Sequence, residues 1–235
     1  MSYVRPSDII VGLLVNKAYQ LPFLADPATI DLSDLNYTLT DILYSKDKDG
    51  IRPFGFIANA EDQGQVVIFR GTEAWSEWAN DTDIKFTSAI PIASGKIHHG
   101  FFGLYINLQT KEGDDTVWRK RLDPDCLLVA GHSLGGALAT FLATEIQARS
   151  LVTFGCPKCG DEVFAASATS LLSEVVRYVV RYDVVTQLPM QAFGQNWTHI
   201  SGPVVLDDKK PNNYKLAGYH SLDTYISLLK NKGMV

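Results

Sequence analysis

"LLVAGHSLGGALATFLATE", from Leu127 to Glu145, joins a short apolar run to a helix-like pattern through a serine flanked by glycines. A run of this length, followed by small and apolar residues, is typical of a buried strand that leads into a helix. Gly131, Ser133 and Gly135 fit the pattern G-x-S-x-G, in which the chain turns sharply between strand and helix. The serine hydroxyl then projects from the top of a sheet. The stretch therefore predicts that Ser133 is a nucleophile.

Strand-like and helix-like stretches alternate on both sides of this turn. The expected strands are 54–60, 64–71, 126–131, 150–155 and 175–183, with a late strand pair or hairpin over 198–208. The expected helices are 6–21, 100–122 with an interruption at Gly113, 134–147, 161–172 and 220–233. This order predicts an α/β fold with a mostly parallel central sheet and helices on both faces. No linker divides the chain, so we expect one domain over 1–235.

Composition and charge narrow the class of partner. The net charge is -5 and the basic residues are scattered, which argues against a nucleic-acid partner because such proteins gather their basic residues on one face. No apolar run reaches the ~18 residues of a membrane span, so no transmembrane segment is expected. The first residues lack a secretory signal pattern. The sequence predicts a cytoplasmic protein, or a secreted one if a leader has been removed.

The cysteines predict neither a disulfide framework nor a metal site. There are three, Cys126, Cys156 and Cys159, an odd and low number. "CPKC" has the spacing of a redox pair or of half a zinc site, but no second pair exists. We expect no metal, no cofactor and no redox role. "DKDG", Asp47 to Gly50, lacks the later ligands of a calcium loop and is interpreted as a turn.

A serine nucleophile needs a base and an acid that orients the base. When the nucleophile lies on a strand-to-helix turn, the chain order is serine, then aspartate or glutamate, then histidine. Only His199 and His220 follow Ser133. His220 lies in an expected loop, where a base has reach, whereas His199 lies in a strand-like run, so His220 is favoured. Asp183 ends a strand at the carboxyl edge of the sheet, where ligands usually bind, and is the expected acid.

The oxyanion formed during acyl transfer needs preorganised donors. The backbone N–H of Leu134, directly after the nucleophile, is one candidate. Thr72, which follows Gly71 at the end of an early strand, is the other. Further on, Trp75 and Trp78 are three residues apart and share one face if their segment is helical. That segment is then either a cover over a substrate pocket or an ordinary surface helix.

Six stretches occur in the order found in one known family: "VVIFRGT", "HHGFF", "VAGHSLGGALA", "TFGCP", "RYDVVTQLP" and "HSLDTY". Together they resemble the class 3 lipase family, which includes fungal triacylglycerol lipases. The resemblance implies an α/β-hydrolase fold, hydrolysis of carboxylic esters and no cofactor. It also implies a catalytic triad of Ser133, Asp183 and His220.

The resemblance extends to residues around the triad. It implies that Thr72 belongs to the oxyanion hole and that the segment with Trp75 and Trp78 is a lid, with Asp83 as a structural cap. His199 matches a structural segment of the family, and we interpret His98 and His99 as structural too. The chain departs from the family in "FGCPKCGD", where Cys156 replaces a serine or alanine.

The expected function is therefore that of a serine carboxylic ester hydrolase. The first hypothesis is a lipase that acts on acylglycerols or related lipid esters, with an oil–water interface as one place of action. An esterase for short-chain or aromatic esters of the feruloyl type is the second. A catalytically silent domain that binds lipid or a partner is the third.

Overall fold

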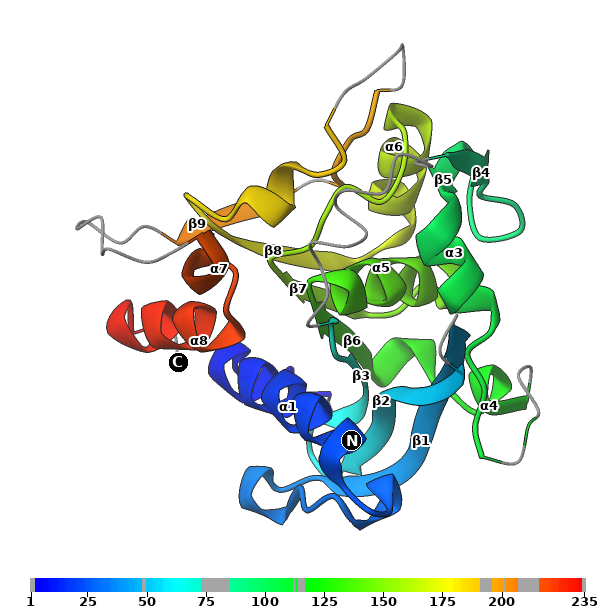
Figure 1. Cartoon of the computed structure of the whole chain (residues 1–235). Coiled ribbons are helices and arrows are strands. Elements are labelled where there is room, and N and C mark those ends of the chain that lie inside the picture. Colours follow the sequence, from blue (N-terminus) through cyan, green and yellow to red (C-terminus); the bar gives the residue numbers. More distant parts are fainter. Residues whose placement is uncertain are drawn as a thin grey trace.

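The structure, a computed structural model, describes residues 3–47, 50–72, 85–111, 113, 117–190, 196–200, 202–206 and 216–233. The larger sheet has seven strands in the order β1-β2-β3-β6-β7-β8-β9 (Figure 1). The strands are β1 (Thr38–Asp47), β2 (Gly50–Ala60), β3 (Gly64–Phe69), β6 (Leu127–His132), β7 (Ser150–Phe154), β8 (Glu174–Val180) and β9 (Pro203–Leu206). The pairs β1–β2 and β2–β3 are antiparallel, and every later pair is parallel. A small antiparallel sheet joins β4 (Phe86–Ser88) to β5 (Lys96–His98).

Helices cover both faces of the large sheet (Figure 1). One face carries α1 (Asp8–Gln20) and α8 (Leu222–Asn231), and the other carries α3 (His99–Ile106), α5 (Leu134–Ile146) and α6 (Glu162–Leu171). The shorter helices are α4 (Val117–Lys120), α7 (Leu216–Tyr219) and the 3-10 turns η1 (Leu21–Phe23), η2 (Pro27–Thr29), η3 (Ser33–Leu35), η4 (Pro124–Cys126) and η5 (Val184–Gln187). The predicted mostly parallel sheet with helices on both faces is confirmed.

Strand β6 shows how the sequence separates the two layers. Leu127 and Val129 belong to the apolar core under α5, whereas Leu128 and Ala130 belong to the core under α1 and α8. Successive side chains of a strand point to opposite faces, so an unbroken apolar run serves both cores. All residues of β6 are buried. The turn at its end is therefore anchored from both sides.

The helix predicted over 100–122 is wrong in extent. α3 ends at Ile106, and α4 covers only Val117–Lys120. Between them, the backbone of Gln109 exchanges two hydrogen bonds of 2.8 Å with Tyr44 in β1. A residue whose N–H and C=O pair with a strand has none left for a helix, which explains the early end of α3.

Of the late strand pair or hairpin predicted over 198–208, the described residues contain one strand, β9. β9 is a single strand that lies parallel to β8. Thr198, expected to start the hairpin, instead forms a bridge with Gly160.

Strand β1 was not predicted, and β2 begins earlier than expected, at Gly50. β1 mixes charged and apolar residues, as suits a strand at the edge of the sheet. Asp47, the last residue of β1, pairs with Gly50, the first residue of β2, and these two residues bound the predicted turn.

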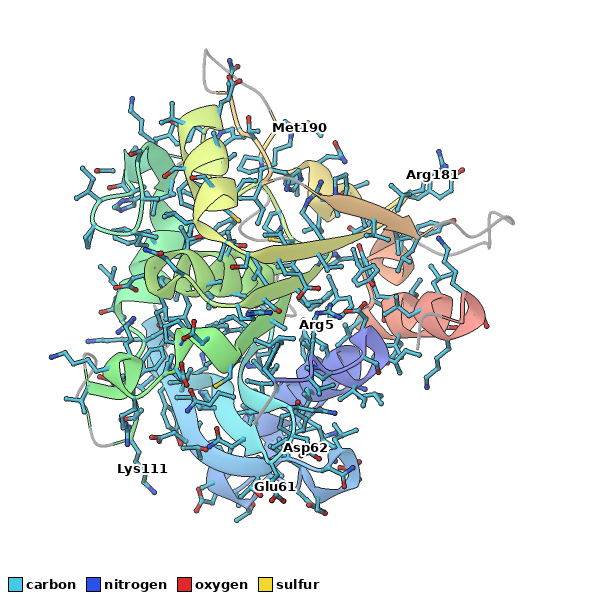
Figure 2. All side chains as sticks on the ribbon, turned by 180° about the vertical axis from the view of Figure 1, so that it is seen from behind. Arg5, Glu61, Asp62, Lys111, Arg181 and Met190 are labelled. Carbon is cyan, nitrogen blue, oxygen red and sulfur yellow. The ribbon has the colours of Figure 1, made fainter. Side chains whose placement is uncertain are left out.

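Surface charge is spread around the molecule. Glu61 and Asp62, Lys111, and Arg181 lie at separate places on its outline (Figure 2). Within the described part of the chain, no helix has both the length and the apolar character needed to cross a bilayer.

Candidate active site

Ser133 occupies the turn between β6 and α5 with an unusual backbone. Its φ is 57° and its ψ is -130°, a backbone conformation that residues other than glycine rarely adopt. Two hydrogen bonds hold it there. The Ser133 N–H donates to the carbonyl of Phe154 at 3.0 Å, and the Gly136 N–H donates to the carbonyl of Ser133 at 2.9 Å. The strain is thus located at the predicted nucleophile.

Glycines on both sides make this turn possible. A Cβ at Gly131 would overlap the carbonyl of Gly135. A Cβ at Gly135 would lie 2.6 Å from the carbonyl oxygen of Phe69 at the end of β3. Helix α5 can therefore start directly against the ends of two strands, as the G-x-S-x-G pattern predicted.

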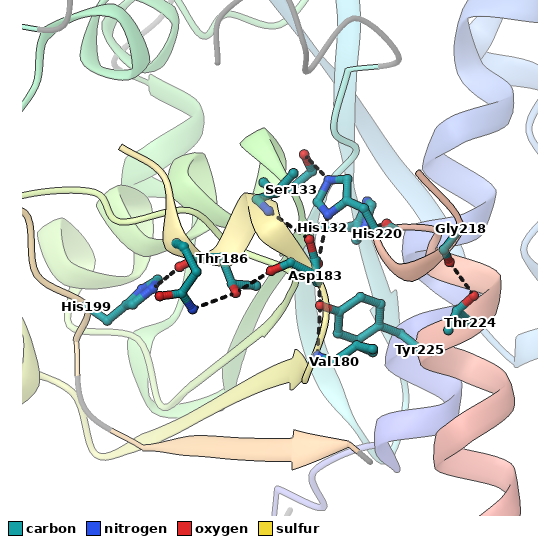
Figure 3. Close-up of polar contacts among 12 residues, drawn as sticks. His132, Ser133, Val180, Asp183, Thr186, His199, Gly218, His220, Thr224 and Tyr225 are labelled. Carbon is teal, nitrogen blue, oxygen red and sulfur yellow. Dashed lines mark hydrogen bonds and ion pairs between the residues drawn. The ribbon is translucent and has the colours of Figure 1, made fainter. Parts of the chain in front are cut away.

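Three side chains predicted from the sequence meet at this turn. Nε2 of His220 lies 2.8 Å from Oγ of Ser133, and Nδ1 of His220 lies 2.8 Å from Oδ2 of Asp183 (Figure 3). A carboxylate only accepts hydrogen bonds, so Nδ1 carries the imidazole proton and Nε2 accepts from the serine hydroxyl. All three side chains are buried. The geometry is that of a nucleophile, a base and an orienting acid.

Asp183 is held by three donors. It caps η5, where its Oδ1 accepts from the Val185 N–H at 3.0 Å. Its Oδ2 accepts from His220 and also from the Tyr225 hydroxyl at 2.6 Å. Burial, and then the charge of Asp183, raise the pKa of Tyr225, so this hydroxyl keeps its proton. These donors stabilise a carboxylate that water barely reaches.

Gly155 leaves room for this arrangement. It follows β7 with a φ of 57°, and a Cβ there would lie 2.8 Å from Oδ2 of Asp183 and 3.1 Å from Nδ1 of His220. The glycine of "TFG" therefore leaves room for the acid, which follows β8, and the base, which precedes α8, to meet.

A second hydrogen-bond chain lies behind the triad. His132 Nε2 is 2.7 Å from the backbone carbonyl of His220, so this nitrogen must carry the proton and donate. His132 Nδ1 then accepts from the Tyr19 hydroxyl at 2.6 Å, and the Gly71 N–H donates to the same hydroxyl at 3.0 Å. Burial, and then the nearby His220, lower the pKa of His132. His132 is thus a neutral link between helix α1 and the backbone of His220.

The two candidate oxyanion residues are neighbours in sequence of groups that meet at the turn, Ser133 and Gly71. Leu134 begins α5, and the first N–H groups of a helix have no partner within it. A Cβ at Gly71 would lie 2.8 Å from the Cβ of Ser133, so the end of β3 touches the nucleophile. Thr72, half-buried, comes directly after it.

The other histidines have different partners. His199 Nε2 donates to the carbonyl of Thr186 at 2.6 Å, and burial, followed by the charge of Arg177, lowers the pKa of His199 to about 4. His98 caps α3, where its Nδ1 accepts from the Phe101 N–H at 3.3 Å.

Several predicted features lie outside the described residues. These are Trp75, Trp78 and Asp83, with the rest of the expected lid.

Cys126, Cys156 and Cys159 are free thiols. In the described ranges, no group of three or more histidine, cysteine, aspartate or glutamate side chains could hold a metal ion.

The sequence analysis missed Tyr225 and Tyr19. Tyr225 lies on α8, and its hydroxyl bonds Asp183. It ends the motif "HSLDTY", so its position five residues after the base was a signal in the sequence that could have indicated its role. Tyr19 follows the pattern of an ordinary amphipathic helix. Its contact with His132 joins residues 113 positions apart, and nothing in the local sequence indicates it.

Comparison with known proteins gives a consistent result. The family model described as "Lipase (class 3)" matches residues 66–193, more than half of the chain. A lipase from Rhizomucor miehei is 29% identical over 160 residues, which cover 64% of this chain and 44% of the relative. A phospholipase A1-II 4 from Oryza sativa subsp. japonica is 26% identical over 216 residues, covering 73% and 54%. The chain spans about half the length of these curated relatives.

Solved structures agree on the fold. The Rhizomucor miehei lipase propeptide complex superposes with a TM-score of 0.68 at 25% identity, covering 86% of this chain and 68% of the other. A structure described as belonging to a family of fungal lipases covers 93% of each chain, with a TM-score of 0.63 at 19% identity. The α/β-hydrolase fold expected from the sequence is confirmed.

Proposed function

Because this chain belongs to the class 3 lipase family, we propose that it is a serine hydrolase that cleaves carboxylic esters of lipids. The observation that carries the proposal is the continuous line from Ser133 through His220 to Asp183, with 2.8 Å at each step. The relatives point to lipid esters, because their names are lipase, phospholipase A1 and galactolipase.

The proposed reaction has two halves. His220 Nε2 takes the proton of the Ser133 hydroxyl as Oγ attacks the ester carbonyl, and Asp183 stabilises the imidazolium that forms. The same proton then passes to the leaving alcohol, and an acyl group remains on Ser133. In the second half, His220 takes a proton from water as the water attacks the acyl-enzyme, and returns that proton to Oγ of Ser133 as the bond to the fatty acid breaks.

Charge on the carbonyl oxygen needs donors in both halves. We assign this role to the Leu134 N–H and to Thr72, whose backbone follows the glycine that touches Ser133. Trp75 and Trp78 are proposed as the apolar edge of a lid over the acyl chain.

Covalent labelling tests the proposal. A fluorophosphonate should modify the native protein, and peptide mapping should place the adduct on Ser133. The Ser133→Ala variant and heat-unfolded protein serve as controls and should remain unmodified. Labelling that is absent, or that lies on another serine, would contradict the triad and favour a catalytically silent domain.

A substrate panel then separates the two kinds of hydrolase. Nitrophenyl esters from acetate to palmitate, a feruloyl ester, emulsified triacylglycerol and phospholipid vesicles should be compared. A lipid hydrolase should prefer the long-chain or emulsified substrates. Activity confined to acetate or to the feruloyl ester would identify an esterase instead.

A further inference from the structure

Two thiols that the mechanism does not use lie together after β7. The Sγ atoms of Cys156 and Cys159 are 3.7 Å apart, and both side chains are buried. Each thiol also reaches the carbonyl of Pro157, at 3.2 Å and 3.3 Å. The backbone between them therefore curves so that both sulfur atoms point to one place.

Unpartnered polar atoms lie near this pair. Thr153 and Arg177 are register neighbours in β7 and β8, with exposed fractions of 1% and 7%. Within the described residues, Thr153 Oγ1 and Arg177 Nε have no hydrogen-bond partner. A buried N–H that lacks an acceptor is unfavourable, and an anionic sulfur beside Nε of Arg177 would relieve that cost.

The electrostatics connect Arg177 to both thiols. Burial lowers the pKa of Arg177, while Cys156 and Cys159 act in the opposite direction. The hydrogen bond with Cys156, and then burial, raise the pKa of Cys159, and Arg177 opposes them. On balance the pKa of Cys159 is raised, so the thiol is its resting form, and Arg177 reduces the cost of forming the thiolate that attacks a disulfide.

The pair also contacts the turn that carries the nucleophile. A Cβ at Gly136, in the first turn of α5, would lie 2.8 Å from Cβ and 3.0 Å from Sγ of Cys156. On its other side, Cys156 follows Gly155, which packs against Asp183 and His220. A shift of the Cys156 side chain therefore acts on both ends of the triad.

We propose that Cys156 and Cys159 are a redox site whose reversible disulfide adjusts the active-site turn. One thiolate attacks a low-molecular-weight disulfide such as glutathione disulfide and releases one glutathione thiolate. The second cysteine, once deprotonated, attacks the mixed disulfide and releases the other. The protein loses two protons and two electrons, and glutathione disulfide, the oxidant, takes them up as two glutathione thiols.

The change in geometry is large on the scale of a catalytic site. Bonded sulfur atoms are about 2.05 Å apart, so a gap of 3.7 Å must close by more than 1 Å. Any part of this movement that Cys156 makes shifts its side chain against Gly136, beside the start of α5. We expect oxidation to lower kcat about tenfold, because displacements of ~1 Å at catalytic groups have effects of this order or larger. This part of the inference rests on the proposed hydrolase function.

Thiol chemistry tests the site without any assay of activity. The Cys126→Ser protein, native and folded, is incubated with glutathione disulfide. Intact mass should fall by two hydrogens, both remaining thiols should become unreactive, and a dithiol reductant should reverse both changes. Matched proteins that also carry Cys156→Ser or Cys159→Ser should form no internal bond. If the folded protein keeps both thiols while the urea-unfolded chain oxidises, the site is overturned.

Arg177 supplies a second readout. Arg177→Met should slow formation of the disulfide about tenfold, while Arg177→Lys, which keeps a charge, should slow it less. If both folded variants formed the disulfide at the rate of the protein that keeps Arg177, then Arg177 would have no part in the redox site.

An activity assay completes the experiment. Oxidised Cys126→Ser protein should hydrolyse a soluble nitrophenyl ester about tenfold more slowly than the reduced form, with recovery on reduction. A disulfide that forms and leaves kcat unchanged would overturn the coupling to the turn. Absence of activity in both forms, with the mass change present, would refute the hydrolase proposal and leave the redox site standing.

Discussion

The hydroxyl of Tyr225 donates to Oδ2 of Asp183 at 2.6 Å, and this is the oxygen that also faces the histidine ring. The same hydroxyl accepts from the Val180 N–H at 3.1 Å. Helix α8 is therefore joined to the acid of the triad and to the end of β8 through one atom.

Removing this atom should weaken both stability and turnover. Tyr225→Phe leaves the Val180 N–H without its partner and takes one donor from the carboxylate. We expect the free energy of unfolding to fall by about 1–3 kcal/mol and kcat by about tenfold to a hundredfold, with little change in KM. Tyr178→Phe is the matched control, because its buried hydroxyl bonds Asp8 away from the site. A kcat loss that is equal in both variants would show a general packing defect.

The Ser133→Ala variant should lose ester hydrolysis by roughly 10³-fold or more. Alanine fits the strained turn about as well as serine, so circular dichroism and the melting temperature should stay close to those of the parent protein. Ser170→Ala, on the exposed side of α6, is the control and should keep full activity. Substantial hydrolysis by pure Ser133→Ala protein would rule out this nucleophile.

The base and the acid should act as one unit with the nucleophile. Asp183→Asn and His220→Ala should each remove most of kcat, and combining either with Ser133→Ala should add little. His199→Gln, which can still donate to the Thr186 carbonyl, should remain active. The assignment of the base would be wrong if His199→Gln were inactive and His220→Ala active.

His199 should make stability depend on pH. Its pKa is about 4 in the folded protein and 6.5 for an ordinary histidine, so between these values only the unfolded chain takes up the proton. Its contribution is complete above pH 6.5 and is lost as the pH falls toward 4, to a total of roughly 3 kcal/mol. Urea titrations between pH 7 and pH 4 should show a smaller loss for His199→Gln than for the parent. Parallel curves would contradict the effect.

The proposed lid makes a separate prediction. Burying Trp75 and Trp78 over an apolar trough would stabilise a closed state by roughly a few kcal/mol at 25 cal/mol per Å², and a lipid surface offers the same edge another partner. Trp78→Ser should therefore reduce activity on emulsions more than on a soluble short ester. Equal losses on both substrates, or none on either, would identify an ordinary surface segment.

Local patterns predicted the parts of the fold that local forces decide. The apolar run of β6 and the glycines around Ser133 specify a strand, a turn and a helix within a few residues. The chain order of nucleophile, acid and base left two histidines, and loop placement together with the family resemblance then selected His220, with Asp183 at a strand end as the acid. By contrast, α3 ends where Gln109 pairs with Tyr44, a residue of a strand far back in the sequence. Pairing over such distances depends on tertiary structure, which periodicity does not record.

The same reason explains the missed site residues. Tyr19 and His132 are 113 positions apart, and Tyr225 meets Asp183 across 42 positions. Tyr19 has no local pattern that separates it from a core aromatic residue, and Tyr225 has only its place at the end of "HSLDTY". Only the packing of α1 and α8 on one face of the sheet brings their hydroxyl groups to the triad.

The position of His220 directly before α8 has a consequence for folding order. Ser133 follows β6 and Asp183 follows β8, on either side of β7 in the central sheet. The base reaches them only when α8 has docked against α1. Until then the chain contains a nucleophile that has no base to activate it. Ester hydrolysis should therefore be the last property to appear during refolding, after the central sheet has formed.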